Sequence, residues 1–207
     1  MTRYTGPKNR IARRFGVNIF GKARNPLLHK QHPPGQHGAK KKKKSDYGVQ
    51  LEEQQKLKAV YGMLTYGQLV NTYKKALLTK GNTAQLFLAA LECRLDNLVY
   101  RLRFAPTIFG AQQLVSHGHI LVNGKKVNRR SFLVKPGMTV SVKSASRQMG
   151  LVQQGQGQVH REIPSYLALE GEDLNTGKLL VLPELDQVPL PLPINIPLVC
   201  EFIAHSS

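Results

Sequence analysis

Positive charge is unevenly distributed along this 207-residue chain, and its distribution is the strongest constraint on what the chain can form. The formal net charge is +18: residues 1–50 carry +12, residues 51–100 carry +2, residues 101–150 carry +9 and residues 151–207 carry −5. A surface that only keeps a protein soluble mixes both signs along the chain. Two cationic regions separated by a nearly neutral one therefore predict a polyanionic partner.

Composition narrows the class of protein further. Hydrophobic residues make up 41% of the chain, too many for a basic tail that never folds, and the length allows one or two domains. Two cysteines cannot form a disulfide framework and favour a reducing compartment. No apolar run approaches the ~20 residues of a membrane-spanning helix, and the N-terminus lacks a signal peptide. We therefore expect a cytoplasmic protein without a membrane partner.

Residues 1–44 are predicted to be an extended basic arm. Prolines and glycines interrupt it, as at Pro33-Pro34, and its few apolar residues have no regular spacing that would support a long amphipathic element. Such an arm is loosely ordered alone and folds against phosphates. The run Lys40 to Lys44 is also compatible with a solvated tail or a localisation signal.

The middle of the chain is predicted to be helical. Apolar residues recur at helical spacing over 49–64 and again over 69–77. The clearest pattern begins after the capping residue Thr83 and ends before Pro106, which predicts one continuous helix. A second face of that helix is expected to be available to a ligand and carries Arg94, Asn97 and Arg101.

A compact pattern follows. Thr107 is the expected cap of a short helix that ends at His117, and Gly118 is its stop. Asn123-Gly124 is a strong hairpin signal between two short strands, and residues 139–143 alternate as a half-buried strand does.

The last third has a different character. Residues 153–158 are rich in Gln and Gly and are predicted to be a loop. Residues 163–169 and 178–183 are predicted to be strands. Five prolines between 183 and 197 oppose long regular structure, and residues 199–203 are compatible with either a strand or a helical turn.

Catalytic and metal-binding motifs are missing from the sequence. There is no phosphate-binding loop and no nucleophile elbow, and Asp96 is best explained as a structural partner of Arg94. His29, His32 and His37 lie close together, but no Cys-x-x-Cys accompanies them to complete a zinc site. We therefore predict no enzyme activity, no cofactor and no bound metal.

A nucleic acid is the polyanion that the remaining features favour. Lys and Arg contact phosphates, and several tyrosines accompany them that can stack on bases or pack in the core. His117 and His119 suit either helix-end capping or contact with a nucleic-acid backbone. Composition alone does not separate RNA from DNA.

Several motifs together resemble one family. The segment Arg3-Tyr-Thr-Gly-Pro-Lys8 with Arg13-Arg14 resembles the N-terminal signature of the small-subunit ribosomal protein four family, bacterial type. Pro34-Gly-Gln-His-Gly38, Lys80-Gly-Asn-Thr83 and the hairpin 120–127 follow in the order expected for that family. The resemblance covers residues 1 to about 145 and the total length.

The resemblance implies an α+β fold: an extended basic N-terminal arm, a small helical domain, and an inserted RNA-binding module of two helices plus a small antiparallel sheet. The segments implied are the arm 1–44, a helical domain 45–93 completed by 187–207, the module 94–154, and a strand-rich extension 155–186.

The resemblance also implies a function. Members are structural constituents of the small (30S) subunit that bind a 5′-domain helix junction of 16S rRNA, nucleate assembly, and influence translational accuracy beside ribosomal protein five and the mRNA on its way into the subunit. The residues expected to contact RNA are Arg3, Tyr4, Lys8, Arg10, Arg13, Arg14, Gln36, His37, Lys40, Lys41, Lys42, Lys43, Lys44, Lys80, Asn82, Arg94, Asn97, Arg101, Gln113, His117, His119, Asn123, Lys125 and Lys126.

Departures from the family and alternatives to this function remain. The arm lacks the four zinc-binding cysteines of some members, and Arg103-Phe104 stands where the family usually has Gly-Phe. Ile108 and Gln112 stand where it usually has arginine. A repressor that binds its own mRNA is a regulatory alternative or addition. An RNA-modifying enzyme bearing the same module would need a catalytic domain for which few residues remain.

Overall fold

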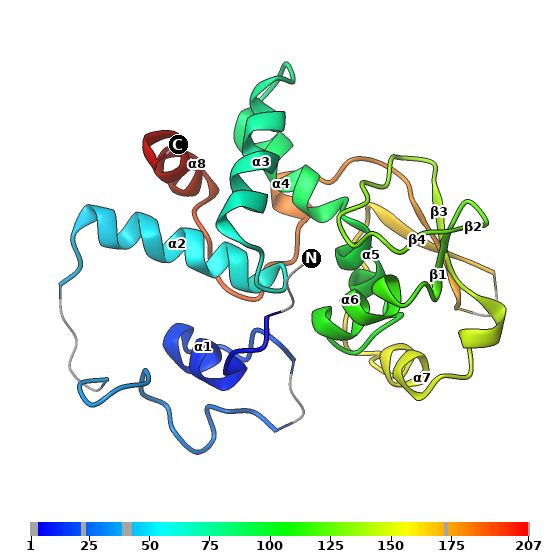
Figure 1. The fold of residues 1–207 in the computed structure, drawn as a ribbon, viewed down its shortest axis with the longest axis horizontal. Helices are drawn as coiled ribbons and strands as arrows, with labels where there is room; N and C mark the ends of the chain where they lie inside the picture. Colours follow the sequence, from blue (N-terminus) through cyan, green and yellow to red (C-terminus); the bar gives the residue numbers. More distant parts are fainter. Residues whose placement is uncertain (1–3, 22–23, 39–42, 172–173, 207) are drawn as a thin grey trace. The chain divides into compact units, whose positions relative to one another are not determined.

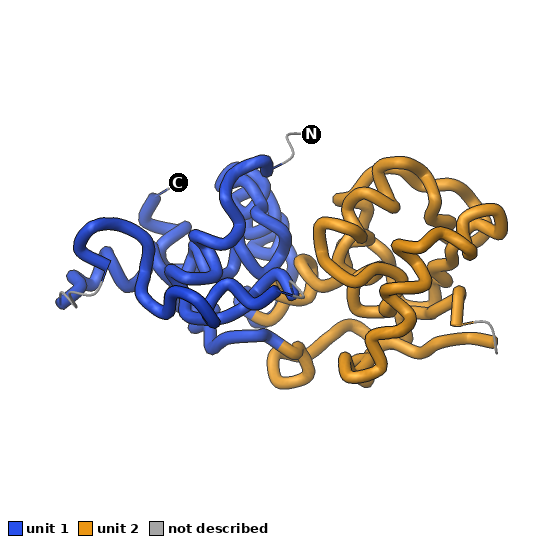
Figure 2. The backbone as a smooth tube through the Cα atoms, turned by 90° about the horizontal axis from the view of Figure 1, so that it is seen from below, with its two compact units in different colours: residues 1–84, 190–207 blue, residues 85–189 orange. Residues whose placement is uncertain are grey.

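A computed structural model describes residues 4–21, 24–38, 43–171 and 174–206. The chain forms two compact units, residues 1–84 with 190–207 (unit 1) and residues 85–189 (unit 2) (Figure 2). The described residues form eight α-helices and one five-stranded antiparallel sheet, so the predicted α+β class is confirmed. No helix among them is both long and apolar enough to span a bilayer.

Unit 1 is helical (Figure 1). Its helices are α1 (Lys8–Phe15), α2 (Asp46–Val60), α3 (Tyr66–Leu77) and α8 (Ile196–Ser206). Side chains cap α2 and α3: Ser45 Oγ accepts from Gly48 N at 3.2 Å, and Thr65 and Gln68 form a reciprocal capping box. These caps agree with the helices expected from apolar spacing.

The C-terminal segment returns to unit 1 as helix α8, which packs against α2 and α3. The backbone N–H of Asn195 donates to the buried Glu53 carboxylate of α2 at 2.8 Å, and the Asn195 side chain caps α8 through Leu198 N. Residues 199–203 are thus helical. Pro197 lies in the first turn of α8, where a missing N–H costs nothing.

The N-terminal segment contains more structure than predicted, because α1 forms within it. Ala12 is buried on this helix, and Ile19 and Phe20 are buried just after it. Gly16, with φ 68°, ends the helix in the left-handed conformation. This helix has only eight residues, and its few apolar side chains make a periodic pattern too short to predict a helix from the sequence.

Unit 2 is built on a sheet with strand order β2-β1-β3-β5-β4. The strands are β1 (Ile120–Val122), β2 (Lys125–Lys126), β3 (Thr139–Val142), β4 (Leu167–Glu170) and β5 (Thr176–Leu179). Helices α5 (Leu95–Arg101), α6 (Ile108–Ser116) and α7 (Gly150–Gln156) accompany it, with 3₁₀ turns at Ser144–Ser146 and Leu185–Gln187. The core is apolar, and Leu98, Phe104, Leu114, Val140 and Tyr166 are fully buried in it.

Two elements of unit 2 differ from prediction. The Gln- and Gly-rich segment expected to be a loop forms helix α7, because Val152 is buried and Gly155 lets the helix approach the backbone of Arg103 and Ala105. Strands β4 and β5 are shorter than expected, and β5 pairs with β3 (Thr139 opposite Lys178). Strands β4 and β5, which lie within the predicted strand-rich extension, therefore belong to the same sheet as β1 and β3.

The single helix predicted from Thr83 to Pro106 is wrong, because the chain breaks into α4 (Thr83–Glu92) and α5. Arg94 adopts an extended conformation, with φ −66° and ψ 138°, and forms a β-bridge with Leu133. Hydrogen bonds from Leu95 N to Phe132 O (2.8 Å) and from Val134 N to Cys93 O (2.9 Å) fix the break. A pairing partner 39 residues away is invisible to local periodicity.

The break buries the carboxylate of Glu92, which is 0% exposed. Arg101 donates to it from Nε at 3.2 Å and from Nη2 at 2.8 Å. Asn97 Nδ2 (2.6 Å) and the Tyr166 hydroxyl (2.8 Å) complete its shell. Burial and the neighbouring carboxylate raise the pKa of Tyr166, so its hydroxyl stays a donor at every physiological pH. We call these four residues the Glu92 network.

Helix α5 ends in a left-handed residue that is not glycine. Arg103 has φ 63°, and the bonds Arg103 N to Tyr100 O (3.2 Å) and Phe104 N to Val99 O (3.1 Å) form a Schellman motif. Arg103 Nε is buried without a partner in the described structure. The conformation explains why the resembling family has glycine at this position.

We predict that Arg101→Met destabilises unit 2 by about 3–5 kcal/mol, because it leaves a buried carboxylate without its counter-charge. The measurement is amide hydrogen exchange of β1 and β3. Arg129→Met, at an exposed position of the same unit, is the control and should change protection little. Equal effects of the two substitutions would contradict a structural role for the Glu92 network.

We predict that Arg103→Gly stabilises unit 2 by about 1 kcal/mol, because glycine removes the steric cost of the left-handed conformation. Thermal unfolding of the full chain measures the change. Arg103→Ala also removes the guanidinium but keeps the Cβ, so it should stabilise less. An alanine variant more stable than the glycine variant would show that backbone strain is not the cause.

Candidate nucleic-acid interface

Unit 2 carries a cationic group that we call the hairpin cluster: His117, His119, Lys126 and Lys143. His117 caps the C-terminus of α6, His119 precedes β1, Lys126 lies in β2, and Lys143 follows β3. The Thr107 cap of α6 and the Gly118 stop form as predicted. One helix end and three strand ends therefore bring these side chains together.

One close contact and one hydrogen bond shape part of the hairpin cluster. Gly118 has φ 74°, and the stem of Lys126 crosses it so closely that a Cβ at this position would collide with Lys126 Cε. The rings of His117 and His119 lie 6.1 Å apart, centroid to centroid. His119 Nδ1 shares a hydrogen bond of 2.9 Å with the buried Ser146. The Ser146 contact thus positions the His119 ring, and Gly118 leaves room for the Lys126 side chain, which is exposed, as are those of His117 and Lys143.

The electrostatics of the hairpin cluster favour an anion. Burial, together with the neighbouring His117, Lys143 and Lys126, lowers the pKa of His119 below 6.5. Residues 101–150 contain nine basic side chains and no acidic ones. The cluster therefore lacks a nearby carboxylate from its own segment, and a bound phosphate would relieve the repulsion.

The β1–β2 turn presents further predicted residues. Asn123 (φ 48°) and Gly124 (φ 76°) form the expected turn. The Asn123 side chain is committed to structure, because Oδ1 accepts from Thr139 N at 2.8 Å. Lys125, in β2, and Gln113, on α6, are exposed and available to a ligand.

Three predicted contact residues are not on an open face. Arg94, Asn97 and Arg101 are buried, with 6%, 3% and 7% exposure. Arg94 pairs with Asp96 through Nε (3.1 Å) and Nη2 (3.0 Å), as the sequence indicated, and the other two belong to the Glu92 network. The expectation that this face is available to a ligand was wrong, because the helix break turns it inward.

Unit 1 presents a second cationic surface on α1 and the loop after it. Arg10 and Arg14 are exposed, whereas Lys8 and Arg13 are half-buried. Arg13 Nε donates to His32 O at 3.0 Å, which ties the loop to the helix. We call the cationic side chains of this helix and loop the α1 surface.

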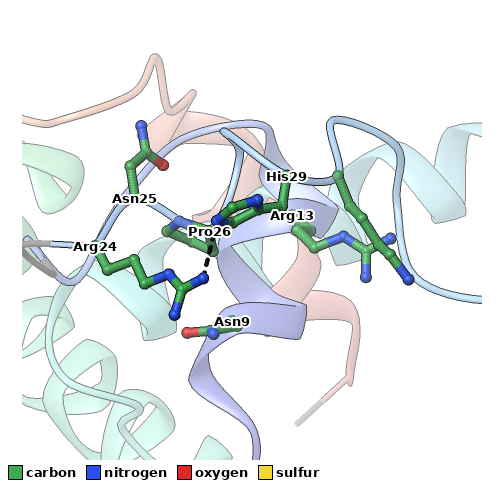
Figure 3. Close-up of a pocket in the computed structure, with 7 residues that line it drawn as sticks. Asn9, Arg13, Arg24, Asn25, Pro26 and His29 are labelled. Atoms are coloured by element: carbon green, nitrogen blue, oxygen red, sulfur yellow. Dashed lines mark hydrogen bonds between the residues drawn. The ribbon is translucent and has the colours of Figure 1, made fainter.

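A pocket of about 420 Å³ opens on the α1 surface (Figure 3). Arg24 and His29 point toward one another there, and Arg24 Nη2 lies 3.1 Å from His29 Nε2. Residues 1–45 contain no acidic side chain, so the arginines at this pocket have no carboxylate from their own segment. Its lining is Asn9, Arg13, Arg24, Asn25, Pro26, His29 and Lys30.

Sequence reasoning missed three cations at these surfaces: Arg24, Lys30 and Lys143. The sequence did contain a signal for them, because their segments have no acidic residue. Every Lys and Arg in such a segment is a candidate for contact with RNA. The zinc alternative gains no support, because His29 Nε2 already faces a guanidinium. The described residues contain no group of three or more His, Cys, Asp or Glu that could hold a metal.

The other predicted residues are dispersed. Tyr4 is half-buried, and Gln36, His37, Lys43 and Lys80 are exposed. Lys44 pairs with Glu52. Asn82 Oδ1 accepts from Ala84 N at 3.0 Å and thereby caps α4 in place of Thr83. Arg3, Lys40, Lys41 and Lys42 lie outside the described residues.

We predict that an NMR titration gives His119 a pKa below the ordinary value of about 6.5. Because burial and like charges cause the shift, Lys143→Gln should raise this pKa part of the way. Lys178→Gln, which removes an equal charge from β5 beside Glu170, should leave it unchanged. A His119 pKa above 6.5 in the unmodified protein would show that the like charges do not act on the ring.

Comparison with known proteins gives consistent matches. The family model of the ribosomal protein S4/S9 N-terminal domain matches residues 3–92, and that of the S4 domain matches residues 93–140. The small ribosomal subunit protein uS4 of Protochlamydia amoebophila is 61% identical over 207 residues, covering both chains completely. The proteins of the same name from Chlamydia muridarum and Chlamydia trachomatis serovar D are each 60% identical over 208 residues, with 99% of each chain covered.

Proposed function

Because this chain belongs to the uS4 family of small ribosomal subunit proteins, we propose that its hairpin cluster and its α1 surface both bind the rRNA of that subunit directly. The family is one of structural ribosomal proteins, so the chain is not an enzyme, as the sequence predicted. The observation that carries the proposal is the hairpin cluster, in which two lysines and two histidines gather in a segment without acidic residues.

The two surfaces suit a branched RNA better than a single duplex. Each surface lies in its own compact unit, and each carries Lys or Arg side chains that can contact phosphates. A helix junction offers closely spaced phosphates from more than one helix. On this basis, and on the motifs described above, we infer that the target is a helix junction in the 5′ domain of 16S rRNA.

Further roles follow from that binding. A protein that holds several RNA helices together before others arrive favours early assembly of the subunit. Effects on translational accuracy, with ribosomal protein five and the mRNA as neighbours, rest on the family motifs. Repression of the chain's own mRNA is an additional proposal, supported because a surface that accepts a folded junction also accepts an RNA that imitates it.

We predict that the affinity for a 5′-domain rRNA fragment falls steeply with salt, with a slope of about −0.7 to −0.9 per phosphate contact in a plot of log affinity against log salt. Replacing Lys126 and Lys143 by Gln should weaken binding and make the slope shallower by about one to two units. Filter binding at several salt concentrations measures both quantities.

Lys178→Gln is the matched control for these substitutions, because Lys178 lies in the same unit but beside Glu170, at 3.7 Å. It should change affinity and slope little. A flat salt dependence, or equal affinity for an unrelated RNA of the same length, would contradict specific phosphate-mediated binding of the junction.

A further inference from the structure

A second cavity, of about 200 Å³, lies between α1 and α2 in unit 1. Each helix contributes three residues at i, i+3 and i+4 spacing, which places them on one face of their helix. Ile11, Arg14 and Phe15 come from α1, and Gln55, Lys58 and Ala59 come from α2. Tyr4, before α1, and Met63, after α2, complete the lining.

The walls of this cavity are apolar and partly aromatic. Tyr4 and Phe15 supply two rings, and Ile11, Ala59 and Met63 supply aliphatic surface. The Tyr4 ring packs so close to Gly6 that a Cβ at Gly6 would collide with it. The glycine therefore lets the ring lie back against the chain at the edge of the cavity.

The polar groups of the cavity are cations and an amide. Lys58 is half-buried, and burial lowers its pKa. It forms no ion pair within the described part of the chain, and no hydrogen bond of the Gln55 amide is seen there either. The Arg14 guanidinium lies 5.7 Å from the centre of the Phe15 ring. The Lys58 ammonium and the Gln55 amide, which have no partner among the described residues, thus adjoin apolar walls.

We propose that the cavity between α1 and α2 receives one unpaired nucleobase that is turned out of the bound RNA. This inference rests on the proposed function, because it assigns one component of the RNA to one place on unit 1. A base has two apolar faces that stack on aromatic rings and a polar edge that hydrogen-bonds to amide and ammonium groups. Tyr4 and Phe15 match the faces, and Gln55 and Lys58 match the edge.

Size and charge select this occupant over others. Pockets for drug-sized ligands measure about 300–1,000 Å³, so a cavity of about 200 Å³ suits a single ring system. A phosphate alone would make no use of the aromatic walls. Arg14 and Lys58 favour an anionic neighbour, and the phosphates on either side of an extruded nucleotide supply one.

The test compares two hairpin RNAs of equal length and charge that bind the full chain. One carries a single-nucleotide bulge of 2-aminopurine, and the other carries an abasic bulge. We expect the protein to bind the 2-aminopurine RNA about 5- to 100-fold more tightly and to quench its fluorescence by stacking. Replacing Tyr4 and Phe15 together by Leu should reduce the preference to within about twofold.

Two controls separate this proposal from the proposed function. Arg10→Gln, on the exposed side of α1, should lower the affinity for both RNAs by the same factor. The preference for the 2-aminopurine RNA over the abasic RNA should therefore remain. With a 5-iodouracil bulge and the unmodified protein, photocrosslinking should attach the RNA to the peptide containing Tyr4 or Phe15, which needs no variant to fold.

The outcomes are distinct. Strong, salt-dependent binding with equal affinity for both RNAs, or a crosslink elsewhere, overturns the base pocket and leaves the proposed function standing. Equal affinities would assign the cavity to another group, such as an acidic side chain of a neighbouring protein. If the protein binds neither of the two hairpin RNAs and also fails to bind the 5′-domain fragment, both proposals are overturned.

Discussion

The burial of one carboxylate organises unit 2. Glu92 is withdrawn from water completely, and the cost of that is offset only because Arg101, Asn97 and Tyr166 donate to it. Arg101 and Asn97 come from α5, and Tyr166 comes from the segment that leads into β4. Their hydrogen bonds to Glu92 therefore tie the end of α4 to α5 and to the start of β4. A second buried pair, Arg94 with Asp96, fixes the chain where α4 ends and α5 begins.

Pairing of acidic residues within the protein also helps to explain why the surface is so cationic. Only five acidic residues precede residue 160, and four of them are committed to contacts within the protein. Glu92 and Asp96 bind buried arginines, Glu53 binds Lys56 and the start of α8, and Glu52 binds Lys44. The 28 lysines and arginines that precede residue 160 far outnumber these carboxylates. Because the buried pairs use carboxylates that could otherwise neutralise surface cations, the surface keeps an excess of positive charge, which favours a polyanionic ligand.

Local signals predicted much of the fold. Thr107 caps its helix and Asn123-Gly124 forms its turn as predicted, because a cap or a turn depends only on neighbouring residues. The break at Arg94 depends on a bridge to Leu133, and helix α7 depends on the close approach of Gly155 to Arg103 and Ala105. Neither can be seen without the tertiary structure. For the same reason the surface residues at the hairpin were predicted, whereas the burial of Asn97 and Arg101 was not.

The position of α8 has a consequence for synthesis of the chain. Its partner α2 is made first, but α8 is contributed by the last residues, and the bond between Asn195 and Glu53 spans most of the polypeptide. A nascent chain can form the sheet of unit 2 before α8 has been synthesised, whereas the contacts of α2 and α3 with α8 form only afterwards. Helices that are made early therefore depend for their final packing on residues that are made much later.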